Sequence, residues 1–295
     1  MKDVLIRSVF GALFLMVVFT PFVYDVRNDA NIMNLVFYVF TLLGTHELFE
    51  MGKKSTHPNN MKLPALLLVT ALFMPLLIQT AARFYPLLFN PVWQFFVDSP
   101  ALYFLWAMLL IGIGIMSYWI FRKEKIDFVF KRTFLFNFFY PVLPMWVLAM
   151  AYTLTEGESK TILLVVLLPI YLNDTLAYVC GRLFGKTPLI PSVSPKKTRE
   201  GFIGGLLGAA VVMLVILYIT GPFNTINALA IVGVSILASI LATLGDLFES
   251  KLKRSVDVKD SGNVLPGHGG ILDRIDAMLF VAPVLFVLLL LVSAN

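Results

Sequence analysis

The chain has 295 residues, of which 59% are hydrophobic and 14% are charged, and its mean hydropathy is +0.85. A water-soluble domain of this length cannot bury so much apolar surface in one core, whereas a lipid bilayer accepts it. The composition therefore excludes a soluble protein, and the formal charge of +5 gives no reason to expect a nucleic-acid partner. The single cysteine, Cys180, excludes an internal disulfide and lies in an apolar stretch where a packing role is expected.

Nine apolar stretches are long enough to cross a bilayer, which takes about 20 mostly apolar residues. The first one runs on through Phe22 without a small-residue cleavage site, so a retained helix is expected there instead of a signal peptide. No repeat or soluble domain interrupts the series, which predicts an all-α membrane bundle forming one integral membrane domain over residues 1–295. The spans are predicted at residues 4–24, 31–50, 62–82, 99–121, 133–155, 160–183, 200–221, 225–250 and 270–294.

The basic residues predict how this bundle is oriented. If the N-terminus is cytoplasmic and the nine spans alternate, 20 of the 23 lysines and arginines lie on the cytoplasmic side. The exceptions are Arg27, Arg83 and Lys160. Positive charge resists translocation, so this asymmetry predicts a cytoplasmic N-terminus and a C-terminus on the opposite side.

Carboxylates at the cytoplasmic ends of the spans mark the candidate site. Asp174 lies inside the sixth predicted span, where an uncompensated carboxylate costs several kcal/mol. Asp246 and Glu249 share one helical face at the end of the eighth span, and Asp273 and Asp276 share one at the start of the ninth.

Salt bridges made for stability alone remain an alternative for each of these pairs. Acids from three spans at one membrane level favour a metal site, and oxygen ligands favour Mg²⁺ or a similar hard cation over zinc. His46, Glu47 and Glu50 end the second span, where solvation at a helix mouth is an equal alternative.

Two cytoplasmic loops supply the complementary positive charge. The first, residues 185–202, carries a short stiffened turn at Ser194–Thr198 that presents Lys196 and Lys197 just before a helix. Lysines beside free helix N–H groups make an anion site, although a plain positive-inside loop has the same composition. The second loop, residues 250–276, holds a Pro-Gly-His-Gly-Gly run that permits close backbone approach to a ligand. Its spacing fits neither a phosphate-binding P-loop nor a dinucleotide fingerprint.

The second loop resembles the signature of the phosphatidate cytidylyltransferase (CDP-diacylglycerol synthase) family. The pattern S-x-L-K-R-x4-K-D-x-G-x2-L-P-x-H-G-G-x2-D-R-x-D is matched from Ser250 to Asp276. Upstream, Asn173-Asp174-Thr175, Gly185-Lys186 and the Ser194–Thr198 run are also similar, so the likeness covers residues 170–276. One departure is Arg199, where the family more often has an aromatic residue. Residues 1–155 resemble the family only as variable membrane helices, whereas residues 160–295 hold the catalytic helices and loops.

The resemblance implies transfer of CMP from CTP to phosphatidate, giving CDP-diacylglycerol and pyrophosphate in phospholipid biosynthesis. It implies dependence on Mg²⁺, with a second cation left open, and a homodimer in a bacterial-type inner membrane with the site facing the cytoplasm. The phosphate monoester of phosphatidate is largely a dianion near neutral pH, so metal binding is expected to matter more than base catalysis.

On these grounds we assign roles to individual residues. The expected catalytic residues are Asp246, Asp273, Asp276, Lys259, Asp260 and His268. The expected metal ligands are Asp246, Glu249, Asp273, Asp276 and Asp174. The expected substrate-binding residues are Ser194, Lys196, Lys197, Thr198, Lys253, Arg254, Gly269, Gly270, Arg274 and Asn173.

Two rival functions stay open on the sequence alone. A CTP-dependent lipid kinase would share the nucleotide site but release CDP instead of pyrophosphate. An ion-coupled transporter would use Asp174 and Asp246 as a pathway, but the outer halves of the sixth, eighth and ninth spans are nearly all aliphatic, which disfavours a through-path.

Overall fold

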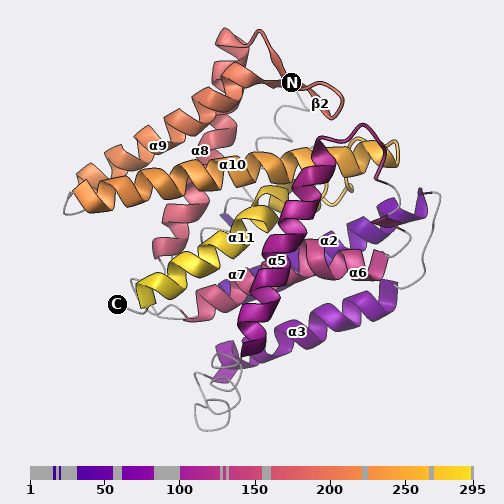
Figure 1. The fold of residues 1–295 in the computed structure, drawn as a ribbon. Coiled ribbons are helices and arrows are strands. Elements are labelled where there is room, and N and C mark those ends of the chain that lie inside the picture. The colour runs from indigo at the N-terminus through magenta and orange to yellow at the C-terminus, as the bar shows by residue number, and fades with distance from the viewer. Residues whose placement is uncertain are drawn as a thin grey trace.

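The computed structural model is an α-helical bundle with one small β-hairpin (Figure 1). It describes residues 16–17, 20, 32–55, 62–82, 100–126, 129–130, 133–154, 161–220, 225–265 and 269–293. Within these residues the expected all-α class is confirmed. The expected first span, residues 4–24, lies almost entirely outside the described residues.

The other eight predicted spans coincide with helices in the described residues, with bounds that agree to within a few positions. The helices are α2 (Met33–Lys53), α3 (Lys62–Ala82), α5 (Pro100–Ile120), α6 (Thr133–Asn137) continued by the π-helical turn η3 (Phe138–Val142) and α7 (Leu143–Leu154), α8 (Thr161–Phe184), α9 (Arg199–Thr220), α10 (Thr225–Ser255) and α11 (Leu272–Ser293). By length and composition, two stretches of the described chain, Arg199–Ile216 and Leu229–Ser255, qualify as membrane-crossing helices.

One local prediction was wrong. The Ser194–Thr198 run is not a turn but strand β2 (Ser194–Thr198), which pairs antiparallel with β1 (Pro188–Ile190). The turn lies instead between these strands. Helix α10 extends beyond the predicted span, which ends at residue 250, and reaches Ser255; its last turn carries Lys253 and Arg254, which favour a helix C-terminus.

The carboxyl-terminal helices cross closely. Helix α9 packs on α8 and α10, and α11 packs on α10 and α7, as Figure 1 shows. Small residues permit these approaches: a Cβ added at Gly205 would lie 2.7 Å from the Asn173 carbonyl oxygen. Cys180 of α8 packs against Gly204 of α9, which agrees with its expected packing role.

An aromatic cluster joins the two halves of the bundle beneath the site. The Phe248 ring of α10 lies 5.3 Å from the Tyr140 ring of η3 and 5.9 Å from the Phe280 ring of α11. All three side chains are buried, and such pairs add about 0.5–1.5 kcal/mol each beyond the area they bury. They hold α10 and α11 in register, and the acidic residues project from the same two helices.

Candidate active site

Lys197 of β2 forms an ion pair with Asp246 of α10. The hairpin brings the lysine there because Thr198 caps α9, its Oγ1 accepting the Gly201 N–H at 3.1 Å. Burial opposes the charge of Lys197, but the Asp246 carboxylate outweighs it and raises the pKa of the ammonium. The lysine loop, expected to supply positive charge that complements the acids, is therefore in direct contact with an acid of α10.

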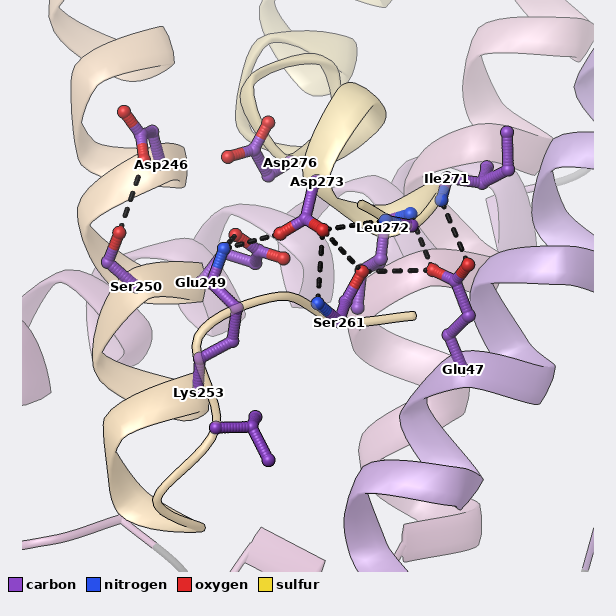
Figure 2. A network of polar contacts seen from close by, with 12 residues as sticks. Glu47, Asp246, Glu249, Ser250, Lys253, Ser261, Ile271, Leu272, Asp273 and Asp276 are labelled. Carbon is purple, nitrogen blue, oxygen red and sulfur yellow. Dashed lines mark hydrogen bonds and ion pairs between the residues drawn. The ribbon is translucent and has the colours of Figure 1, made fainter. Parts of the chain in front are cut away.

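Asp276 of α11 faces α10 on the side where Asp246 projects (Figure 2). The two helices approach closely at Gly245, where an added Cβ would lie 2.5 Å from the Asp276 carbonyl oxygen. Asp174 of α8 is near enough to interact electrostatically with Lys197, Asp246 and Arg274. Asp246 thus contacts Lys197 directly, and Asp174 and Asp276 act on the same lysine only through the electrostatic field.

Lys253 lies between two further carboxylates. Its ammonium forms ion pairs with Glu249, one turn earlier on α10, and with Asp273 in the first turn of α11 (Figure 2). All three side chains are nearly excluded from solvent, with 11%, 1% and 9% exposed respectively. Such a charge triad is stable only while every member is present, because removing one leaves a buried charge uncompensated.

Asp273 is already fully engaged within the protein. Its Oδ2 accepts the Ser261 N–H and hydroxyl, both at 3.0 Å, and the Gly270 N–H at 2.8 Å. Its Oδ1 faces Lys253. The Gly270 N–H, which we expected to bind a phosphate, therefore donates to Asp273 in this structure, and Asp273 organises the loop that precedes α11.

Glu47 is a central residue that the sequence assignment of the site left out. This α2 side chain is 3% exposed, and its carboxylate accepts the N–H groups of Ile271 and Leu272, both at 2.9 Å. It also accepts the Ser261 hydroxyl at 3.0 Å (Figure 2). A carboxylate at a helix N-terminus satisfies unpaired N–H groups and the helix dipole. The solvated alternative is wrong for Glu47, whereas Glu50 is partly exposed and pairs with Lys53 and Lys62.

The glycines of the second loop make room for these two carboxylates. A Cβ at Gly262 would lie 2.5 Å from Glu47 Oε1, and one at Gly270 would overlap Ser261 Oγ and Glu47 Oε2. Gly269 has a φ of +81°, a conformation that L side chains rarely adopt. In the described residues, these glycines serve close approach to Glu47 and Asp273.

The remaining predicted site residues lie at varied distances from this cluster. Asn173 is buried, donates to the Thr243 hydroxyl at 3.4 Å, and its Oδ1 has no hydrogen-bond partner in the described residues. Arg254 is exposed and donates to the Val258 carbonyl oxygen at 3.2 Å. The others are Lys196, Lys259 and Asp260, which are exposed, Ser194 at the start of β2, Arg274 in the first turn of α11, and His268, which lies outside the described residues.

The oxygen ligands present suit a hard cation. No three acidic, histidine or cysteine side chains of the described chain gather as a metal cluster. Both carboxylate oxygens of Glu249 are buried and accept no hydrogen bond in the described part of the chain, although the carboxylate forms its ion pair with Lys253. Mg²⁺ is commonly held by one or two carboxylates together with substrate phosphates, and the Asp246–Asp276 pair fits that mode.

Carboxylates paired with a partly exposed lysine and with a buried one are a combination that can bind phosphate groups together with a cation. The model of the cytidylyltransferase family matches residues 5–292, and the chain belongs to that family. It is therefore a nucleotidyltransferase.

Similar proteins carry a more specific name. The chain is 40% identical over 184 residues to a phosphatidate cytidylyltransferase of Staphylococcus haemolyticus, covering 62% of this chain and 68% of that one. It is 38% identical over 202 residues to a phosphatidate cytidylyltransferase of Aquifex aeolicus, covering 66% of this chain and 73% of that one.

Proposed function

We propose that this chain is a phosphatidate cytidylyltransferase, which transfers CMP from CTP to phosphatidate. The observation that carries the proposal is the Lys197–Asp246 ion pair, because it joins the lysine loop to the acids of α10 and α11. The name shared by the Staphylococcus and Aquifex relatives supports the same reaction.

In this reaction a phosphate oxygen of phosphatidate attacks the α-phosphorus of CTP. The bond between that phosphorus and the bridging oxygen of the β-phosphate breaks, so CDP-diacylglycerol forms and pyrophosphate leaves. A phosphate monoester has a second pKa of about 6, so the attacking group is mostly a dianion at neutral pH and needs no strong base. Repulsion between two anions is the main obstacle, and positioned cations lower it.

Lys197 and Lys253 are the cations that the fold positions for this task. Each is held by carboxylates, Lys197 by Asp246 and Lys253 by Glu249 and Asp273. Because the carboxylates already fix its position, each ammonium loses little conformational entropy when an anionic triphosphate binds. It also stays charged beside its partner acids. The exposed Lys196 and Lys259 would add charge at the mouth of the site.

We propose that Asp246 and Asp276 hold Mg²⁺ jointly with the CTP phosphates, with Asp174 and Glu249 oriented around them. When bound, the cation would neutralise triphosphate charge and withdraw electrons from the phosphorus. Asp273 keeps its predicted metal role only as a proposal, because its oxygens are engaged by Ser261, Gly270 and Lys253.

We propose nine spans, with the site on the cytoplasmic side, and assembly as a homodimer. The placement of 20 of the 23 basic residues supports the orientation, and two stretches of the described chain that are long and apolar enough to cross a membrane support insertion. Cysteine accessibility scanning in intact cells tests the topology. Crosslinking of the purified chain tests the dimer.

The deciding assay combines purified full-length protein, radiolabelled CTP, phosphatidate and Mg²⁺. We expect labelled CDP-diacylglycerol and pyrophosphate. CDP together with an unlabelled phosphorylated lipid would establish a lipid kinase. If no CTP-dependent product formed, the transporter would be the remaining alternative.

The same assay tests the dependence on Mg²⁺. Activity should vanish with EDTA and return with Mg²⁺. In Asp246→Asn, added Mg²⁺ should restore less than about one-hundredth of the parent turnover. The matched control Glu50→Gln should behave as the parent, because Glu50 lies in a partly exposed ion-pair cluster.

A further inference from the structure

A basic pocket lies beside the C-terminal end of α10, away from the acidic cluster. The pocket has a cavity volume of about 160 Å³ and is open to the surface on one side. The loop that follows α5 forms one wall, the turn between β1 and β2 a second, and the last turns of α10 the third. Among the described residues, five cationic side chains and a single acidic one, Glu124, line it. The cations are Arg122, Lys123, Lys125, Lys251 and Arg254.

The walls of this pocket are fixed to one another. The Ile126 N–H donates to Ser255 Oγ at 3.0 Å, and the buried Lys251 ammonium donates to the Arg122 carbonyl oxygen. Val193, in the turn between the strands, is 3% exposed and belongs to the hydrophobic core. In Figure 1 the loop after α5 lies beside the end of α10. The cations are therefore presented by a preformed concave surface and not by a loose loop.

The pocket and the acidic cluster use different faces of α10. Asp246, Glu249 and Lys253 recur at intervals of three and four and face α11 or the hairpin lysine. Lys251 and Arg254 project toward the α5 loop instead. Thus Arg254, although part of the sequence signature, lines a second positively charged site.

The existing partners of these cations are weak competitors for an incoming anion. Lys125 pairs with Asp257 at 3.1 Å, and Arg122 pairs with Glu124 at 4.0 Å, with at least half of each side chain exposed. Exposed pairs of this kind contribute little free energy, because water screens the two charges. A phosphate group offers up to four oxygens to several cations at once, and the cavity is several times larger than the roughly 30 Å³ that one water occupies, enough for one phosphate group.

We propose that this pocket is a second anion-binding site, which takes the phosphate ester of a lipid headgroup or of a small phosphate compound. The inference is independent of the proposed reaction, because the charge and walls of the pocket do not involve the acidic cluster. Under the proposed topology the pocket opens at the cytoplasmic membrane surface, where lipid phosphates are at hand.

Binding to the purified full chain in neutral detergent tests the proposal. The probes are dioctanoyl phosphatidylglycerol, for a lipid headgroup, and inorganic phosphate, for a free anion, each titrated by calorimetry. The variant Lys123→Ala/Lys125→Ala removes two exposed pocket cations. The matched control Lys53→Ala/Lys54→Ala removes two exposed lysines at the end of α2. Circular dichroism checks that both variants keep the parent helicity.

We expect the pocket variant to bind at least one probe about tenfold more weakly, since it loses two charge-assisted contacts to the anion. The control should bind as the parent does. Binding of the lipid alone supports a headgroup site, and comparable binding of both probes supports a general phosphate site. If both variants lost the same binding affinity, the probes would be responding to general surface charge and the proposal would be wrong. It would also be wrong if the parent protein bound neither probe.

Discussion

The Glu47 carboxylate accepts the Ile271 N–H at 2.9 Å, although 224 positions separate the two residues. This contact ties α2, in the half of the chain predicted to be variable, to the first turn of α11 in the catalytic half. Ser261 bridges the same carboxylate to Asp273, with both Ser261 hydroxyl contacts at 3.0 Å. The N-terminal helices therefore do more than pack around the bundle, because one of them holds the acidic end of α11 in place.

Replacing Glu47 with alanine should destabilise the protein strongly. The change leaves the Ile271 and Leu272 N–H groups buried without their charged acceptor, at a cost of about 3 kcal/mol or more. The control is Glu50→Ala on the same helix, whose partly exposed ion pairs should contribute less than about 1 kcal/mol. Thermal unfolding in detergent measures both. If the two variants had the same unfolding midpoint, the buried hydrogen bonds of Glu47 would not contribute the stability expected of them.

Asp246→Asn and Asp273→Asn should differ in stability although both lose activity. The Asp246–Lys197 pair is about one-third exposed, so its loss should change stability little, whereas turnover should fall by about 10²–10³-fold. Asp273→Asn keeps one oxygen for the Ser261 and Gly270 donors, but it places an amino group against the buried Lys253 ammonium and removes the charge that pairs with it, at a cost of about 3 kcal/mol. Unfolding midpoints measured beside turnover separate the two roles. A fully stable Asp273→Asn would contradict the organising role.

Lys197→Ala should raise the KM for CTP more than the KM for phosphatidate. The lysine is held beside the proposed metal acids, so its loss should weaken binding of the triphosphate by about tenfold, the effect of one charge-assisted contact. Steady-state kinetics with each substrate varied in turn measures the split. Lys54→Ala, an exposed lysine distant in sequence, is the control. An equal rise in both constants would argue against contact with CTP.

Helix bounds were predictable because apolar length is a local property. The expected 62–82 span coincides with α3, and 99–121 differs from α5 by one residue at each end. Helix α10 reaches Ser255, beyond the predicted span, because the apolar run stops before the helix does. The π-helical turn at Phe138–Val142 was missed, although Pro141 inside it has no N–H to donate and so disturbs the regular helical ladder.

Site residues were predictable from the sequence where opposite charges had to balance each other. They were missed where a side chain binds a partner far away in the sequence. The lysine loop and the acids at the helix ends were expected to share one site because their charges balance, and the individual Lys197–Asp246 pair emerged only from the structure. The burial of Glu47 has no local signature, since its partners are backbone N–H groups of another helix. Likewise, Gly270 suggested a ligand-facing backbone, but the group that approaches it most closely belongs to the protein itself.

Gly270→Ala should therefore destabilise the loop even without substrate. The new Cβ would overlap the Ser261 hydroxyl and the Glu47 carboxylate, which are both buried and hydrogen-bonded to each other. Forcing them apart should cost about 2 kcal/mol or more. Gly114→Ala is the matched control, because nothing lies within 4 Å of an added Cβ at this position inside α5, and the change should stabilise the helix by about 0.5–1 kcal/mol. Opposite shifts of the unfolding midpoint in detergent are expected. If Gly270→Ala unfolded at the same temperature as the parent but lost CTP binding, the glycine would make room for the ligand and not for the Glu47 carboxylate.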